Sequence, residues 1–183
     1  MAVVVVIGGG PAGYSAALFT AKAKLDTVLF ETNETKMHNA YLYNYLGIPE
    51  IHGTELIKIA RRQAEKFGAK VREEKIMKIE RKGQKFVIET ASGNHEEAKY
   101  VVIATGLNDD LLKQIGVGYE GDAVKVDRHG QTTVENVYAG GWVTRSKSQA
   151  IISAGDAAAA AIHLIAKETG KPYKDFDVPP GTK

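Results

Sequence analysis

Three glycines near the amino terminus have the spacing of a phosphate-binding turn. Gly8, Gly10 and Gly13 form the pattern GxGxxG, directly after a β-branched run and directly before an alanine-rich segment. In such a turn the first glycine permits a tight bend, the second lets the backbone approach a pyrophosphate, and the third allows close packing of the helix on the strand. The helix that begins there offers free N–H groups and partial positive charge to phosphates. The pattern alone is a weak signal, but this context predicts a dinucleotide site.

An acidic residue at the end of the next predicted strand narrows the choice of dinucleotide. Glu31 follows Gly13 by 18 positions. Its carboxylate can accept hydrogen bonds from ribose hydroxyls, and its charge would repel a 2'-phosphate. The residues therefore favour a dinucleotide of the FAD or NAD kind over NADP.

The elements that position these residues form a strand, helix, strand unit. Residues 3–7 are apolar and β-branched without alternation, which is typical of a central strand buried on both faces of a parallel sheet. Pro11 suits the first turn of a helix that reaches about residue 23, and residues 25–30 resume a strand. We expect a Rossmann-like, doubly wound α/β fold with a central parallel sheet, a helical layer and a smaller antiparallel β layer over residues 75–90.

The rest of the pattern continues this architecture. Thr54 is expected to cap a helix over residues 54–67, with Arg61 and Arg62 on its solvent face. A long, alanine-rich helix is expected over residues 149–167. Further strands are predicted at residues 70–71 and onward, 75–80, 85–90, 98–104, 123–126 and 137–139.

The organisation of the chain indicates one domain. Its 183 residues suit a single core, and no linker or repeat interrupts the pattern. We expect residues 1–183 to form one domain, with residues 171–183 as a tail of surface coil.

Composition excludes several kinds of site and partner. The chain has no cysteine, so it holds no disulfide, thiolate zinc site or CxxC redox couple. Its five histidines lack paired spacing, and no metal is expected. The net charge of +2 shows no bias towards nucleic acid. With no apolar run near the ~20 residues that span a bilayer and no signal-peptide pattern, we expect a cytoplasmic protein with neither nucleic-acid nor membrane partners.

Four blocks of the chain resemble the FAD-binding domain of thioredoxin reductases, in that family's order. They cover most of residues 2–166, so the resemblance is far more specific than one glycine motif. It implies FAD as the cofactor, with residues 1–106 and 122–170 matching the two halves of the family's FAD domain. The blocks are VVVVIGGGPAGYSAALFTAKAKLDTVLFE, NYLGIPEIHGTELIKIARRQAEKFGAKV, KYVVIATG and TTVENVYAGGWVTRSKSQAIISAGDAAAAAIHL.

The resemblance also implies which residues hold the cofactor. The glycine turn would bind the FAD pyrophosphate, Glu31 the adenosine ribose, and Asn44 would lie beside the flavin. The ATG segment that ends at Gly106 would turn against the cofactor. The amino terminus of the helix after Gln149 would stabilise negative charge on the pyrimidine side of the isoalloxazine. The expected cofactor-binding residues are Gly8, Gly10, Pro11, Ala12, Gly13, Glu31, Asn44, Ala104, Thr105, Gly106, Gly141, Gln149 and Ala150.

Departures from the family pattern are equally informative. Only residues 107–132 separate the ATG segment from the block that contains VYA, where the family has its NADPH-binding domain and CxxC disulfide. These residues contain no cysteine. Trp142 stands where the family has an aspartate, and Asp156 is expected inside the last helix and not as its replacement. We therefore expect no self-contained relay from NADPH through FAD to a disulfide.

Several interpretations follow. The first is a thioredoxin reductase-like flavoprotein, an oxidoreductase or electron carrier whose donor or acceptor is a separate redox partner protein or a diffusible molecule such as NADH or NADPH. The second is a non-catalytic FAD-binding module that acts as a flavin store, sensor or assembly subunit. A third places NAD on Glu31 and the glycines. The resemblance also implies a homodimer.

Aromatic residues leave two alternatives open. Trp142 is expected either near the flavin or at a surface or dimer interface. Tyr41, Tyr43 and Tyr45 would either cover the isoalloxazine or form a half-buried loop with solvent-facing hydroxyls.

Overall fold

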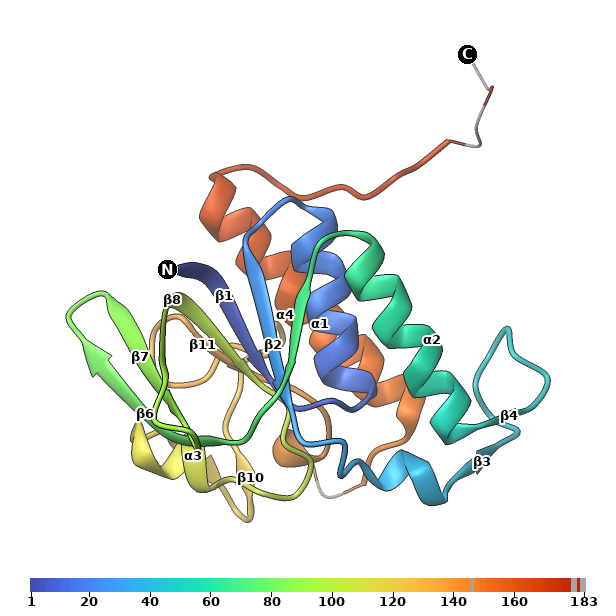
Figure 1. Cartoon of the computed structure of the whole chain (residues 1–183), viewed down its shortest axis with the longest axis horizontal. Helices are drawn as coiled ribbons and strands as arrows, with labels where there is room; N and C mark the ends of the chain where they lie inside the picture. The colour runs from blue at the N-terminus through green and yellow to red at the C-terminus, as the bar shows by residue number, and fades with distance from the viewer. Residues whose placement is uncertain (146, 179–180, 182–183) are drawn as a thin grey trace.

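A seven-stranded sheet forms the centre of the fold (Figure 1). The computed structural model describes residues 1–145, 147–178 and 181. The strands of the sheet are β1 (Ala2–Ile7), β2 (Thr27–Glu31), β5 (Lys70–Glu73), β6 (Ile76–Lys82), β7 (Lys85–Thr90), β8 (His95–Ile103) and β11 (Val137–Ala139). Their order is β5-β2-β1-β8-β7-β6, and β11 also pairs with β8. As predicted, β1 is central and runs parallel to both of its neighbours, β2 and β8.

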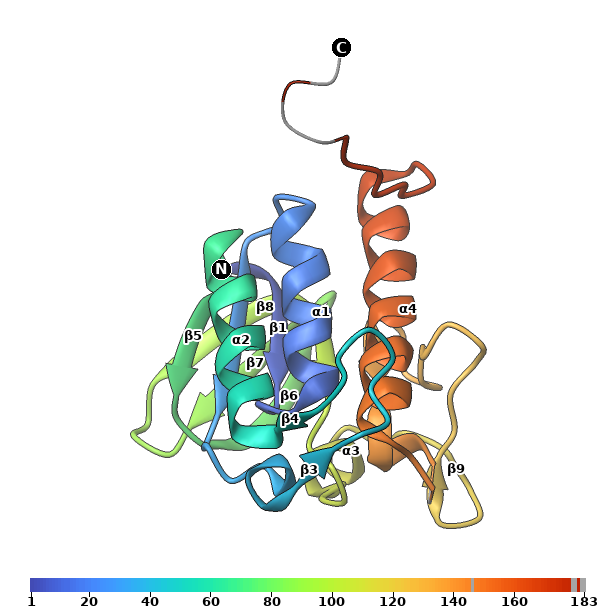
Figure 2. The same cartoon turned by 90° about the vertical axis from the view of Figure 1, so that its right-hand side faces the viewer.

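Three long helices cover one face of the sheet. They are α1 (Pro11–Lys22), α2 (Gly53–Lys66) and α4 (Ala150–Thr169). Figure 2 shows them side by side, with α1 between α2 and α4. The remaining elements are short: α3 (Asp110–Gln114), the 3-10 helices η1 (Lys36–Asn39) and η2 (Gly141–Thr144), and strands β3 (Tyr41–Leu42), β4 (Ile51–His52), β9 (Tyr119–Glu120) and β10 (Ala123–Val124).

The sheet divides the hydrophobic core into two layers. Val4 and Val6 of β1 pack with the buried side chains of α1, α2 and α4. Val5 and Ile7 pack on the opposite face with residues from β6, β7 and α3. Both faces of β1 are therefore buried, which explains the unbroken apolar run in its sequence. The fold confirms the predicted Rossmann-like α/β class with a helical layer and a small antiparallel part.

The antiparallel strands belong to the same hydrogen-bonded sheet as the parallel ones. β7 pairs antiparallel with the first half of β8, up to Ala98, whereas β11 pairs parallel with its last residues, Val101 to Ile103. The long strand β8 therefore pairs along one edge with two strands in succession, first β7 and then β11. The predicted layer over residues 75–90 is the β6–β7 hairpin, which extends from this edge (Figure 1).

The structure corrects the predicted start of α2. The cap is His52, whose Nδ1 accepts a hydrogen bond from the Thr54 amide at 3.2 Å. The Thr54 hydroxyl instead contacts Nδ1 of His38 at 3.0 Å. Thr54 lies inside the helix because Gly53 already donates its N–H to the carbonyl of Ala40 at 2.8 Å. That bond joins the helix start to the preceding segment, for which the sequence predicted only a loop.

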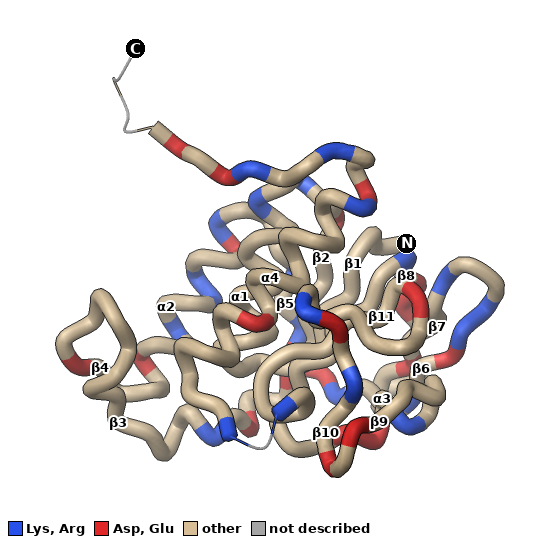
Figure 3. The backbone as a smooth tube through the Cα atoms, turned by 180° about the vertical axis from the view of Figure 1, so that it is seen from behind, with Lys and Arg blue, Asp and Glu red and all other residues tan. Residues whose placement is uncertain are grey.

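The carboxyl-terminal segment lies against the end of α1. Residues 171–178 and 181 contain no helix or strand, which agrees with the predicted coil. Lys22 of α1 nevertheless binds Asp175 and Asp177 through hydrogen-bonded ion pairs of 2.6 and 2.5 Å. Charged residues of both signs are otherwise spread along the chain, as the coloured backbone in Figure 3 shows from behind.

Helix α4 is longer and more apolar than the sequence analysis allowed. It has 20 residues, and an 18-residue window within it has a mean hydropathy of 1.4, so by length and composition alone it reaches the range of a membrane span. The prediction that no apolar run approaches this length is therefore wrong. Much of this apolar character comes from alanines, and Ala157, Ala160, Ala161 and Leu164 are fully buried in the core shared with α1. The helix is a packed element of this domain.

A pair of stacked histidines makes the stability of the α4 region sensitive to pH. The rings of His129 and His163 stack at 4.6 Å, and His163 Nδ1 contacts the Tyr138 hydroxyl at 3.0 Å. Burial, and then the neighbouring His129, lowers the pKa of His163 below its ordinary value; Lys167 also lowers it, whereas Asp127 raises it. The unfolded chain therefore binds this proton more readily, and stability should fall as pH drops through about 6.5.

Thermal melting at pH 7.5 and pH 5.5 measures this effect. We expect a lower Tm at pH 5.5, and a smaller difference between the two pH values in a His163→Gln variant. A variant whose Tm changes with pH as much as the wild type would contradict the assignment to His163.

Candidate nucleotide-binding site

A large cavity opens at the carboxyl edge of the parallel strands. Its volume is about 710 Å³, within the range of small-molecule and cofactor sites. The ends of β1, β2 and β8 meet the first residues of α1, α4 and η2 there. Ligands of open α/β sheets bind outside the carboxyl ends of the strands, so the cavity lies where the fold favours a ligand.

The glycine turn at this cavity depends on the absence of side chains. Gly8 has a φ of +120°, and a Cβ there would lie 2.2 Å from the carbonyl oxygen of Ala104. A Cβ on Gly13 would lie 1.7 Å from the carbonyl oxygen of Gly8. A Cβ on Gly10, in contrast, would make only an ordinary contact with Thr35 Oγ1 at 3.6 Å, and Gly10 lines the cavity. Gly8 and Gly13 therefore close the turn, while Gly10 leaves the backbone accessible to a ligand.

Two helix amino termini open on the same cavity. Gly10 caps α1 and Gln149 caps α4, and neither cap makes a side-chain hydrogen bond to its helix. Ala12 of α1 and Ala150 of α4 line the cavity. Within the described residues the caps therefore leave the N–H groups of the first helical turns without a side-chain acceptor, and both helix dipoles are positive at this end. The arrangement suits an anionic or electron-rich ligand.

Glu31 supplies a buried carboxylate to the cavity wall. The residue is 4% exposed and ends β2. Its Oε2 accepts a hydrogen bond from the Asn33 amide at 3.1 Å. A Cβ on Gly9 would lie 2.4 Å from the same oxygen, so the carboxylate rests on the backbone of the glycine turn. The predicted ribose acceptor and the predicted phosphate turn are therefore in contact.

The structure brings most of the predicted site residues together. Gly13 does not line the cavity; it lies behind the wall, where it lets α1 pack closely against the carbonyl of Gly8. Asn44 and Gln149 lie outside the cavity wall and contact each other, with Asn44 Nδ2 donating to Gln149 Oε1 at 3.2 Å. The predicted residues that line the cavity are Gly8, Gly10, Pro11, Ala12, Glu31, Ala104, Thr105, Gly106, Gly141 and Ala150.

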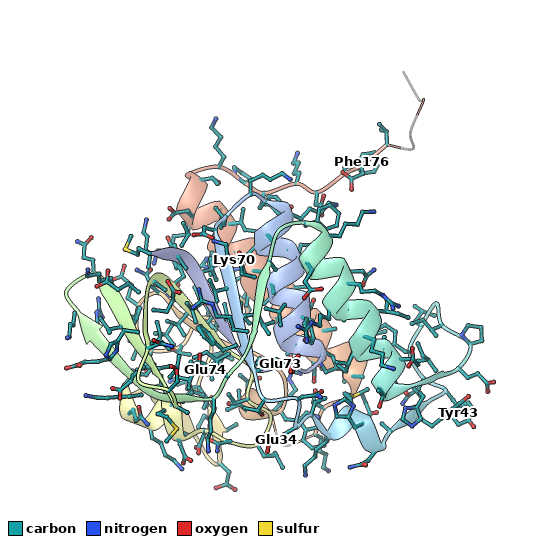
Figure 4. All side chains as sticks on the ribbon, in the orientation of Figure 1. Glu34, Tyr43, Lys70, Glu73, Glu74 and Phe176 are labelled. Atoms are coloured by element: carbon teal, nitrogen blue, oxygen red, sulfur yellow. The ribbon has the colours of Figure 1, made fainter. Side chains whose placement is uncertain are left out.

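Several cavity residues were not identified from the sequence. They come from the segment after β2, the start of β6, α3, and the first turns of η2 and α4. The sheet order places β5 beside β2, and β6 begins directly after β5. The start of β6 therefore reaches the cavity, which the sequence alone does not show. Figure 4 shows Glu34, Glu73 and Glu74 near one another at this end of the sheet. The additional lining residues include Gly9, Thr35, Lys36, Met37, Glu74, Ile76, Met77, Leu111, Gln114, Trp142 and Ser153.

The structure places Trp142 on the cavity wall, in η2. The indole Nε1 donates to the carbonyl of Ser148 at 3.1 Å, and the Lys36 ammonium lies 5.7 Å from the ring centroid. Asp156 lies inside α4, as predicted, and pairs with Arg145 at 2.9 Å. Burial raises the pKa of the Asp156 carboxyl, partly opposed by Arg145.

The tyrosine-rich segment forms a projecting hairpin, β3–β4 (Figure 1). Tyr41 and Tyr43 are exposed, with ring centroids 5.1 Å apart, and Figure 4 shows Tyr43 far from the sheet. Tyr43 and Tyr45 line a second, shallow hollow within residues 43–49. None of the three lines the large cavity in the described part of the chain.

Comparisons with known proteins agree with this geometry. The family model described as pyridine nucleotide-disulphide oxidoreductase matches residues 2–106 and, in an overlapping alignment, 42–161. The thioredoxin reductase of Streptomyces coelicolor is 34% identical over 129 residues, which are 63% of this chain and 40% of that protein. The bifunctional thioredoxin reductase/thioredoxin of Mycobacterium leprae is 37% identical over 114 residues, 60% of this chain and 25% of that protein. The chain spans between a quarter and two fifths of these relatives.

Solved structures share the fold. A thioredoxin reductase from Gloeobacter violaceus superposes with a TM-score of 0.87 at 20% identity, over 97% of this chain and 99% of that chain. The atypical thioredoxin reductase TRi from Desulfovibrio vulgaris Hildenborough superposes with a TM-score of 0.81 at 21% identity, over 92% of this chain and 99% of that chain.

Proposed function

Since the chain belongs to the pyridine nucleotide-disulphide oxidoreductase family, we propose that its large cavity binds FAD and that the protein is a thioredoxin reductase-like oxidoreductase or electron carrier. The observation that carries the proposal is the contact between the glycine turn and the buried Glu31 carboxylate, at a cavity that two helix amino termini share. A phosphate-binding turn and a ribose acceptor in contact are what a dinucleotide requires.

The residues of the cavity fit the parts of FAD. Gly10 leaves its backbone open, and the amide groups that begin α1 would bind the pyrophosphate. Glu31 would accept hydrogen bonds from the adenosine ribose. The amino terminus of α4 would face the electron-rich part of the flavin and favour negative charge there. When bound, FAD would supply hydride and electron transfer chemistry.

The protein would hold the flavin and leave exchange of electrons to another molecule. The chain has no cysteine, and residues 107–132 form only α3 and the β9–β10 pair within the described structure. A separate redox protein or a diffusible nicotinamide would then be the donor or acceptor. The alternative, a non-catalytic flavin store, sensor or assembly subunit, rests on the same lack of a redox disulfide in the chain.

Cofactor identity and reduction test this proposal. The purified protein is expected to be yellow and to release FAD on denaturation, identified by its mass. Release of NAD would overturn the choice of flavin. In anaerobic stopped-flow mixing with NADH or NADPH, reduction faster than that of free FAD would support the oxidoreductase. If neither NADH nor NADPH reduces the bound flavin faster than it reduces free FAD, the result would favour the non-catalytic module.

We also propose a cytoplasmic homodimer. Tyr41, Tyr43 and Leu46 expose apolar surface on the β3–β4 hairpin, and Ile151 and Ile152 do so at the start of α4. Exposed aromatic and aliphatic side chains of this kind favour contact between protein surfaces. Light scattering should give a mass of two chains. A mass near the 19.8 kDa of one chain would contradict the dimer.

A further inference from the structure

Two glutamates lie side by side where β2 and β5 end. Glu31 and Glu73 are partners in the register of these parallel strands. Like charges on adjacent strand positions destabilise a sheet unless a cation separates them. Arg61 of α2 supplies that cation: its Nη1 lies 3.4 Å from Glu31 Oε1 and hydrogen-bonds Glu73. The sequence predicted that Arg61 faces solvent, but its side chain is only 34% exposed and contacts the buried Glu31.

Arg61 is held in place by a third carboxylate. Its Nε donates to Glu65 Oε1 at 3.0 Å, one helical turn along α2. Glu65 and Glu73 are exposed to solvent, whereas the side chain of Glu31 is 3% exposed. The two exposed pairs are screened by water and contribute little, but they fix the guanidinium in one orientation. The pair with Glu31 is shielded from water, so its loss would leave a buried charge without compensation.

Two other groups complete the surroundings of Glu31. Tyr14 of α1 is 2% exposed and lies near the Glu31 carboxylate. Its pKa is raised, first by burial and then by the charge of Glu31. The Asn33 amide donates to Oε2 on another side. Arg61 is the one cation among the three, and it lies outside the described lining of the cavity.

We propose that Arg61 is a positioning residue for nucleotide binding. It offsets the repulsion between Glu31 and Glu73 and holds the Glu31 carboxylate in place against the glycine turn, where it can accept hydrogen bonds from a ribose. Arg61 acts through Glu31 and does not touch the ligand. This inference rests on the proposed binding of FAD, and it assigns to the second helix a part in selecting the adenosine half of the ligand.

A double-mutant cycle tests this role. Dissociation constants for FAD and for ADP, which has the ribose but no flavin, are measured by calorimetry for the wild type, Arg61→Met, Glu31→Gln and the double variant. Arg61→Met should weaken both ligands about tenfold, as expected for a buried charge left without its partner. In the Glu31→Gln background the same substitution should have an effect of less than about twofold, because positions that act through one group are not additive.

Two further variants separate positioning from general damage. Arg62→Met changes an exposed arginine at the next position and should leave both affinities within about twofold. Arg61→Lys keeps the charge but not the planar fork geometry of the guanidinium, so it should bind both ligands about threefold more weakly than the wild type and about threefold more tightly than Arg61→Met. If circular dichroism shows that Arg61→Met does not fold, Arg61→Lys provides the test. This substitution should weaken FAD and ADP binding in the wild-type background and have no such effect in the Glu31→Gln background.

The outcomes distinguish this inference from the proposed function. Unchanged FAD and ADP affinities in Arg61→Met and Arg61→Lys, with a wild type that binds both, would overturn the positioning role and leave FAD binding intact. An equal loss in the Glu31→Gln background would show that Arg61 acts independently of Glu31 and would also overturn it. A folded wild type that binds neither ligand would overturn the proposed function itself.

Discussion

Replacement of Gly13 by alanine is expected to abolish FAD binding and to lower the free energy of unfolding by about 3 kcal/mol, the upper range for overpacking. The added Cβ would lie 1.7 Å from the carbonyl oxygen of Gly8. No side-chain rotation relieves a clash with backbone, so α1 must move away from β1 and the turn must open. The start of α1 would then no longer present its amides beside Glu31.

A glycine in another helix provides the matched control. Gly155 lies within α4, is exposed, and has open space around the position of a Cβ. Gly155→Ala should therefore raise stability by up to about 1 kcal/mol through helix propensity and leave FAD affinity unchanged. Urea unfolding and FAD titration of both variants make the comparison. Retention of wild-type FAD affinity by Gly13→Ala would show that the turn is not the phosphate site.

Truncation of Leu164 to alanine is expected to destabilise the whole chain by about 3 kcal/mol. Leu164 is fully buried on α4, in the core that α1 and α4 share. These helices come from the two separated halves of the sequence, 1–106 and 122–170, which we predict to be one domain. Because the cavity uses the starts of both helices, the variant should also bind FAD more weakly.

The shape of the unfolding curve tests the single domain. Both the wild type and Leu164→Ala should unfold in one transition by circular dichroism and by tryptophan fluorescence. The control, Ile162→Ala, removes a half-exposed side chain of the same helix and should cost less than about 1 kcal/mol. Two separate transitions, or a Leu164→Ala variant with wild-type stability, would contradict a core shared by the two halves.

The glycine turn and Glu31 could be predicted from sequence because their roles depend on local geometry. A GxGxxG after a buried strand and before a helix places Gly8 and Gly13 in close backbone contact. The strand that follows ends at Glu31 in the structure. The central strand could also be predicted from the sequence, because its residues are buried on both faces of the sheet and are therefore apolar without alternation. The local sequence pattern was therefore sufficient to predict that the glycine turn and Glu31 lie together at the cavity.

Features that depend on strand order could not be predicted in this way. The role of Arg61 follows from the register that places Glu31 beside Glu73, and the sequence holds no signal for that pairing. The start of β6 and α3 reach the cavity for the same reason. The position of Trp142 follows from the turn of η2 between β11 and α4. Tertiary arrangement, not local propensity, determines these parts of the wall.

Titration of the cofactor-free protein with FAD would show directly whether the large cavity is a flavin site. Flavin absorbance and fluorescence, followed at constant protein concentration, should change until one FAD is bound per chain, and added ADP should displace it, because both ligands require Glu31 and the glycine turn. A folded protein that shows no saturable change with FAD would contradict the assignment of the cavity as a flavin site.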